Sequence, residues 1–225
     1  MYSSMRITAR VFAFFIAGCA LSCSQEDQEI RIENGKPAEE EYEPAEAYLQ
    51  LQAGNYWVYE SYSINLETGE ETPLHKRDSV YVLKDTLIGR SNYFILQGSR
   101  LGREYRSILR CSGPEVMDSE GHLLFSTASI GDTSSLSPSL LVDGTESGEY
   151  CVQFFKNMEV PYGIFDGLKY QRTFTLPSSE EIRAGGKVRH QSDYFAKGVG
   201  LIQYTSFLLN QPLDIELRLV RSNVQ

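Results

Sequence analysis

From Tyr48 onward, short runs of β-branched and aromatic residues alternate with short runs of turn-forming residues. Residues 55–64 form the densest run, and their side chains divide between two faces with a period of two. About ten such runs follow one another, and none keeps apolar residues at helical spacing over three turns. Strands without intervening helices favour an antiparallel sheet that curls or stacks. The sequence therefore predicts a mainly all-β domain, a half-barrel or barrel-like curved sheet with at most one or two short helices.

The exceptions to the strand pattern are few. Residues 44–51 and 178–182 have the composition of short helices. Residues 127–148 are rich in Ser, Thr, Gly and Asp, which predicts a long loop or short irregular strands.

The N-terminus has the features of a bacterial secretory signal. Arg6 and Arg10 supply positive charge, and residues 11–18 form an apolar run that is too short for a bilayer span of about 20 residues. Small residues lead into Cys19 and again into Cys23. Both sites resemble the lipobox of bacterial lipoproteins, whose cysteine carries diacylglycerol and palmitate-type acyl chains.

Cys19 matches the usual order of an aliphatic residue and two small residues more closely. Cys23 has the longer preceding apolar run, and the acidic sequence that follows it resembles the surface-export signal of some Gram-negative lipoproteins. We therefore predict lipidation at Cys23, with Cys19 as the alternative. The acyl chains would anchor the protein without a membrane-spanning segment, as an outer-membrane lipoprotein that is periplasmic or surface-exposed.

The segment after the signal is strongly acidic. Residues 24–46 contain nine acidic side chains against Arg31 and Lys36, and they show no apolar periodicity. Such a stretch cannot bury enough surface to offset its ordering entropy. We expect a signal peptide at 1–22, a disordered tether at 23–46 and a single β-rich domain at 47–225.

Composition argues against several classes of function. A net charge of -9 disfavours nucleic acid as a partner, because phosphate binding requires an excess of Lys and Arg. His75, His122 and His190 have no metal-ligand spacing, and there is no G-x-S-x-G elbow or phosphate-binding glycine loop. We therefore expect no catalytic residues, metal or cofactor, and no enzymatic activity.

Cys111 and Cys151 remain after signal processing. The cell envelope is oxidising, so a disulfide between them is one interpretation, and it would add about 4 kcal/mol in the chain-entropy model. Two buried free thiols are the other interpretation. Spacing alone does not decide between them.

A basic cluster, formed by Arg100, Arg103, Arg106 and Arg110, surrounds one strand. It has two interpretations. The cluster could meet an anionic ligand or the acidic tether. Alternatively, it marks an edge strand whose charges prevent edge-to-edge pairing, and this interpretation is favoured.

Two motifs near the ends of the domain carry a resemblance to a known group. The first contains Gly54, Asn55, Trp57 and Tyr59, and the second contains Lys197, Gly198 and Gly200. Together they resemble uncharacterised bacterial outer-membrane lipoproteins whose β-rich domain has the pattern GNxWxY … KGVGLVxY. The resemblance covers most of 47–225, although Ile202–Gln203 replaces the usual Val-Lys. It implies a half-barrel like that of periplasmic lipoprotein carriers, but no named activity.

The motif residues themselves favour a structural role. Glycine permits positive φ or close backbone approach, and Trp57 is a large apolar anchor. The aromatic content and the implied half-barrel predict that the concave face binds a lipophilic or extended molecule without catalysis. The alternative is an interaction or structural subunit of a cell-envelope assembly. A concave face filled by side chains or capped by a helix would exclude the binding function.

Overall fold

The computed structural model describes residues 42–135, 147–177, 186–209 and 211–224, and residues 41–225 form one compact unit. The helix α1 (Glu46–Leu49) lies within the segment 44–51 that was expected to be helical, whereas 178–182 lies outside the described residues. The described strands are β1 (Tyr56–Asn65), β2 (Glu71–Ile88), β3 (Ser91–Arg100), β4 (Arg103–Ser112), β5 (Glu115–Asp118), β6 (Leu123–Ser126), β7 (Thr133–Ser135), β8 (Ser147–Val160), β9 (Gly163–Thr175), β10 (Val188–Ala196), β11 (Gly200–Phe207) and β12 (Leu213–Ser222).

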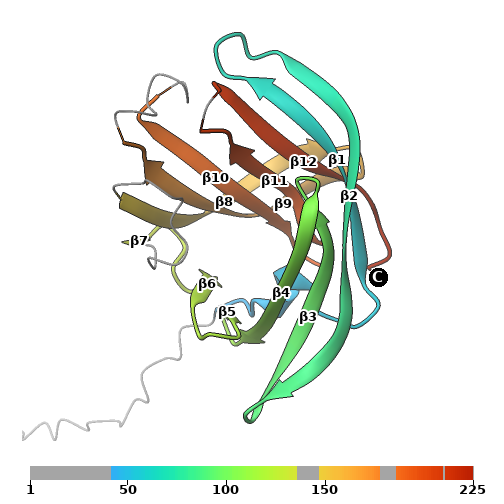
Figure 1. The fold of residues 1–225 in the computed structure, drawn as a ribbon. Helices are drawn as coiled ribbons and strands as arrows, with labels where there is room; N and C mark the ends of the chain where they lie inside the picture. Colours follow the sequence, from blue (N-terminus) through green and yellow to red (C-terminus); the bar gives the residue numbers. More distant parts are fainter. Residues whose placement is uncertain (1–41, 136–146, 178–185, 210, 225) are drawn as a thin grey trace, which may run out of the picture. The chain divides into compact units, whose positions relative to one another are not determined.

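These strands form one continuous antiparallel sheet (Figure 1). The order is β6-β5-β4-β3-β2-β1-β12-β11-β10-β9-β8-β7, so most strands pair with their sequence neighbours and the first strand pairs with the last. In the described part of the chain, β6 and β7 end the order without pairing with each other. The sheet is curved and open. This confirms the predicted all-β half-barrel with minimal helix.

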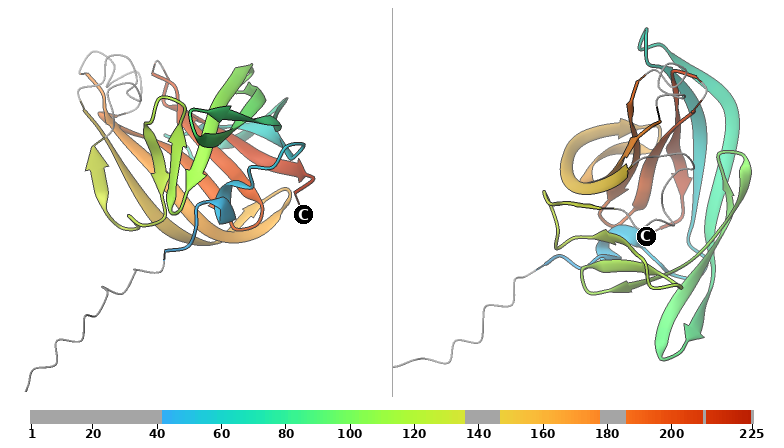
Figure 2. Two further views of the ribbon diagram at one scale, coloured as in Figure 1. Left: turned by 90° about the horizontal axis from the view of Figure 1, so that it is seen from below. Right: turned by 60° about the vertical axis from the view of Figure 1, so that its left-hand side comes forward.

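β-bulges accompany the curvature. The register shifts at Val58/Tyr59 in β1, at Val82/Lys84 in β2 and at Tyr194/Phe195 in β10. An extra residue in one strand bends that strand and increases its local twist. The strands consequently bend around a common inner face, as the two views of Figure 2 show.

The core lies on this concave inner face. Trp57 and Tyr59 on β1 point inward, and so do Leu168 and Phe174 on β9, which are fully buried. Alternate residues of a strand point to opposite faces, so the inward set is largely apolar and aromatic while the outward set is more polar. The two-residue period of the sequence therefore specifies which face is buried.

The segment before β1 packs against the domain. Ala45 is fully buried and its amide donates to Gly113 O at 2.9 Å. The Ala47 carbonyl accepts from the Gly198 amide at 2.8 Å, and the Tyr48 hydroxyl donates to Glu43 at 2.6 Å. Glu43 also pairs with Lys197. The folded unit thus begins upstream of residue 47, the boundary expected from composition.

The two sequence motifs meet in space. The Trp57 indole donates to Val199 O at 2.6 Å, and the Tyr59 hydroxyl donates to Leu201 O at 3.0 Å. The strands that carry them, β1 and β11, flank β12. Gly200 has a φ of 100° and lies against the Trp57 ring. The motif residues therefore hold the first strand against β11 and the turn before it, and Gly198 joins that turn to the N-terminal segment.

This contact makes a stability prediction. A Cβ at position 200 would lie 3.0 Å from Trp57 Nε1, so Gly200→Ala adds steric overlap to the strain of a positive φ. We expect the free energy of unfolding to fall by about 2–4 kcal/mol, measured by urea denaturation. Gly198→Ala is the matched control, because φ is 74° there and nothing lies within 4 Å. Equal losses in the two variants would contradict a packing role for Gly200.

Candidate functional site

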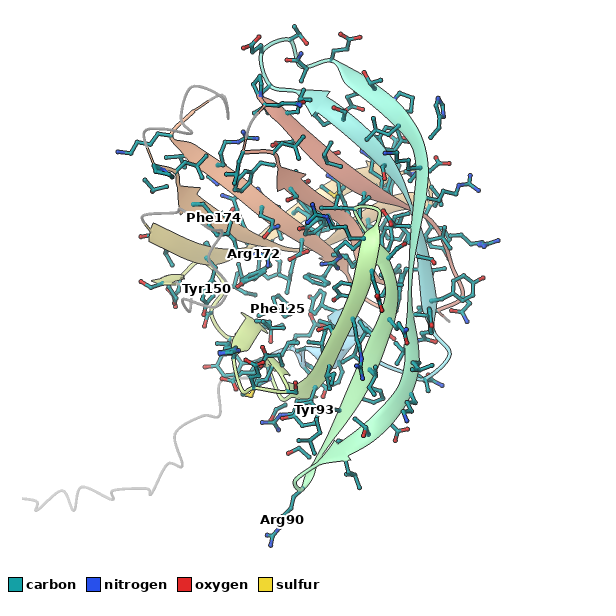
Figure 3. All side chains as sticks on the ribbon, viewed as in Figure 1. Arg90, Tyr93, Phe125, Tyr150, Arg172 and Phe174 are labelled. Carbon is teal, nitrogen blue, oxygen red and sulfur yellow. The ribbon has the colours of Figure 1, made fainter. Side chains whose placement is uncertain are left out.

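A cavity of about 370 Å³ opens on the concave side of the sheet. Its walls come from both halves of the strand order and from the segment that contains α1. Figure 3 shows Arg172 and Phe125 on the inner side of the curved sheet. The lining residues are Leu49, Leu51, Trp57, Tyr59, Val80, Leu96, Arg100, Tyr105, Ser107, Leu109, Val116, Asp118, Leu124, Phe125, Tyr170, Arg172, Asp193, Phe195 and Leu201.

Most of the cavity wall is apolar. On β4 the residues at alternate positions, Tyr105, Ser107 and Leu109, all line the cavity, as the two-residue strand period requires. Leu49 and Leu51 bring the segment around α1 to the same cavity. The concave face is therefore partly covered by this segment but retains open volume between apolar side chains.

Arg100 is the central cation of the cavity. It ends β3, and its guanidinium lies 4.6 Å from the ring centres of both Tyr105 on β4 and Tyr204 on β11. Since β2, β1 and β12 separate β3 from β11 in the sheet, this side chain spans the concave face. Both rings attract the cation through their negative π faces. Arg100 thus links the two halves of the curved sheet through stacking.

Asp193 on β10 provides the counter-charge. Its Oδ2 pairs with Arg172 Nη2, and its Oδ1 lies 4.0 Å from Arg100 Nη1. The Asp193 side chain is 9% exposed, the Arg172 side chain 18% and the Arg100 side chain 25%. One carboxylate therefore faces two guanidiniums at the cavity.

Several buried polar atoms of this cluster have no hydrogen-bond partner within the described residues. They are Tyr170 Oη, Arg172 Nε and Asp193 Oδ1. All three residues line the cavity, and burial raises the pKa of Tyr170, which keeps its hydroxyl protonated. Because buried polar groups are normally satisfied, these atoms mark a place where a polar partner fits. The cavity thus combines apolar walls with one polar region.

Asp118, the last residue of β5, lines the cavity at another point. Its Oδ1 accepts from the Glu120 and His122 amides at 2.9 Å, and its Oδ2 lies 2.9 Å from His122 Nδ1. Burial is the largest single influence and opposes ionisation of Asp118, but the hydrogen bonds from His122 and the Glu120 amide, with the charge of His122, together outweigh it and lower its pKa. The hydrogen bond between the two side chains raises the pKa of His122. This carboxylate is satisfied by its own turn.

The basic cluster seen in the sequence is divided by the fold. Arg100 points to the cavity, whereas Arg103 and Arg106 are exposed. Arg110 stacks 5.5 Å from the Tyr93 ring centre. The favoured edge-strand interpretation is wrong, because β4 lies between β3 and β5 and has neighbours on both sides.

The cysteines are not bridged. Cys111 on β4 and Cys151 on β8 are both free thiols. Burial raises the pKa of Cys111 to about 12, which disfavours a reactive thiolate. Cys19 and Cys23 lie outside the described residues.

The three histidines lie on separate elements, with His75 on β2, His122 between β5 and β6, and His190 on β10. Over 42–135, 147–177, 186–209 and 211–224, no group of three metal-ligating side chains is clustered. No helix in the same ranges is long and apolar enough to cross a membrane.

Sequence reasoning did not identify Tyr170, Arg172 or Asp193. The relevant signal is the alternation Tyr170, Arg172, Phe174, which places a charge on the aromatic face of β9. Asp193 follows four polar residues, 189–192, so the local sequence does not mark it as buried. Only the pairing of Asp193 with Tyr170 and Tyr204 on the flanking strands brings the cluster together.

The counter-charge predicts a stability effect. Asp193→Asn leaves the buried Arg172 guanidinium without its ion-pair partner, and we expect a loss of about 3–5 kcal/mol in urea denaturation. Asp85→Asn on the exposed part of β2 is the control, with a change below about 0.5 kcal/mol. Similar small changes in both variants would show that Asp193 does not balance the buried arginine.

Comparisons with known proteins give limited matches. No protein-family model and no curated protein matches the sequence. One solved structure is an inferred exported protein with a YmcC-like fold from Bacteroides fragilis, 13% identical, with a TM-score of 0.40, covering 78% of this chain and 98% of that chain. Another is an inferred lipoprotein from Parabacteroides distasonis, 14% identical, with a TM-score of 0.43, covering 77% of this chain and 96% of that chain.

Proposed function

We propose that this protein is a lipid-anchored lipoprotein of the cell envelope whose β domain binds a lipophilic molecule without catalysis. The observation that carries the proposal is the cavity of about 370 Å³ on the concave face, with apolar walls and a single cationic region. Pockets for small molecules have volumes of about 300–1,000 Å³ and combine apolar walls with a few polar groups. The size and lining of this cavity both fit that class.

The charged groups of the cavity suit binding better than catalysis. General acid–base catalysis needs a group that can exchange a proton near neutral pH. Arginine keeps its proton at that pH, and Asp193 is held by Arg172. Among the described residues that line the cavity there is no histidine or cysteine. We therefore propose that Arg100 and Arg172 contribute charge and hydrogen bonds to a bound molecule.

The membrane anchor belongs to the same proposal. Acyl chains on Cys23 would hold the domain at the outer membrane, through the acidic segment that follows. An anchored domain with an apolar cavity could receive a lipophilic molecule from the membrane surface or hold it there.

The binding function is tested by filling the cavity. Ser107 lines it and is partly buried, so Ser107→Phe should place a ring in the open volume. We expect binding of the neutral fluorescent probe N-phenylnaphthylamine to weaken at least tenfold, because the aromatic ring occupies its space. Arg106→Phe adds the same ring to the exposed outer face of the same strand and should leave binding unchanged. Unchanged probe binding by Ser107→Phe, or no binding by the wild type, would refute the proposal.

The anchor is tested separately in cells that carry the natural signal. Cys23→Ala should leave unlipidated precursor that no longer partitions into membranes, while Cys19→Ala should be processed normally. Intact mass and detergent partition measure both results. Loss of lipidation only in Cys19→Ala would move the anchor to that residue. Normal mass and partition in both variants would disprove a lipid anchor.

A further inference from the structure

We infer that Arg100 is the anion-binding residue of the cavity and that the ligand is a single-chain amphiphile with one carboxylate head group. This inference rests on the proposed binding function and specifies its ligand class. It follows from the hydrogen bonding of Arg100, the charge balance around Asp193 and the position of the unpartnered polar atoms.

The N–H donors of Arg100 are unused within the described part of the chain. Its guanidinium carbon lies 4.6 Å from the ring centres of both Tyr105 and Tyr204. Arg100 makes no hydrogen bond with any described residue, and its ion-pair contact among them is with Asp193 Oδ1, 4.0 Å from Arg100 Nη1. A planar guanidinium whose N–H groups have no partner matches the two oxygens of a carboxylate in a bidentate arrangement. The donors of Arg100 are therefore available to such a group.

Arg218 on the outer face provides a direct comparison. It also stacks on a tyrosine, with its guanidinium 4.6 Å from the Tyr62 ring centre. Its three nitrogens, however, donate to Glu71 at 2.8 and 2.9 Å and to Glu216 at 2.8 Å. The chain thus satisfies a stacked arginine with its own carboxylates where the role is structural. At Arg100 no carboxylate oxygen of a described residue lies within hydrogen-bond distance, so a ligand could supply one there.

The ion pairs of the cavity set two guanidiniums, those of Arg100 and Arg172, against the single carboxylate of Asp193, so this cluster has one more positive than negative charge. Among the described residues, Asp118 contacts His122, and Asp78 accepts from the Gly102 amide at 3.1 Å; neither carboxylate forms an ion pair with Arg100 or Arg172. One negative charge on the ligand would balance the cluster. A doubly charged phosphate would be opposed by the nearby Asp193 carboxylate.

Other polar atoms and the apolar wall of the cavity complement the two ends of an amphiphile. Tyr170 is 3% exposed, and its hydroxyl and Arg172 Nε both lack partners within the described residues and line the same cavity. They can donate to a carboxylate beside Arg100 or to a water that it holds. Leu96, Leu109 and Phe125 supply the apolar wall for an alkyl chain. Head and tail of an amphiphile therefore both find complementary surfaces.

The experiment compares two probes that differ only in their head group. Dodecanoate and dodecanol are titrated below their self-association limits at a pH where the carboxyl is ionised. The readout is the emission of Trp57, the single tryptophan, which lines the cavity. Wild type should bind dodecanoate about tenfold to a hundredfold more tightly than dodecanol, as expected for hydrogen bonds to a charged group. Acetate should not compete, because it has no chain.

The variants assign the preference to Arg100. Arg100→Met should bind dodecanol as the wild type does and lose the preference for dodecanoate. Arg100→Lys, which keeps the charge but not the planar fork, should retain only part of it. Arg103→Met is the matched control, since Arg103 is the exposed cross-strand neighbour of Arg100. Dodecanol binding shows that each variant keeps its folded cavity.

The outcomes separate the two proposals. If neither probe binds, the binding function and the head-group inference both fail. If wild type binds both probes with equal affinity, or Arg100→Met keeps the preference for dodecanoate, the cavity binds lipophilic molecules but Arg100 does not read the head group. Competition by acetate as strong as by dodecanoate would overturn the amphiphile in favour of a free carboxylate.

Discussion

The pairing of the first strand with the last is the constraint on which the rest of the structure depends. β1 and β12 pair from Trp57↔Ser222 to Asn65↔Leu213, and this joins the strands from β1 to β6 to those from β7 to β12 in one sheet. Closing a contact between such distant segments costs chain entropy before any packing compensates it. The contacts of Trp57 and Tyr59 with β11 and the turn before it supply part of that compensation. Without this pairing, the concave face would not exist as a continuous surface.

The cavity depends on the same joint. Arg100 and Tyr105 come from strands on one side of it, and Tyr204, Asp193 and Arg172 come from strands on the other. Bringing these charges out of water is costly, and a buried ion pair is weak evidence for stability. An apolar cluster of similar volume would hold the two halves together at less cost. The charges and unpartnered donors of this cluster therefore fit the proposed ligand-binding role better than a purely structural role.

Much of the architecture could be predicted from the sequence because strand periodicity is local. The densest run, 55–64, corresponds to β1 within one residue at each end. The β8–β9 hairpin is harder to predict from the sequence. A register shift between Phe155 and Met158 and the positive φ of Asn157 interrupt the alternation of inward and outward side chains along β8. Residues 42–46 were assigned to the tether because they are acidic. In the structure Ala45 is buried and Glu43 pairs with Lys197, a contact with no signature in local composition.

The sequence by itself determined the strand period, the inward-facing set of apolar residues and the acidic segment behind the candidate lipidation site, because each depends on neighbours along the chain. The two motifs also stand out in the sequence, through their resemblance to the pattern GNxWxY … KGVGLVxY. Only the tertiary structure decided that the motifs touch and that Arg100, alone of four nearby arginines, points into the cavity. It also decided that Asp193 and Arg172 join Arg100 there. Those facts depend on curvature and on the β1–β12 pairing, which bring together strands more than 60 residues apart and leave no trace in any local pattern.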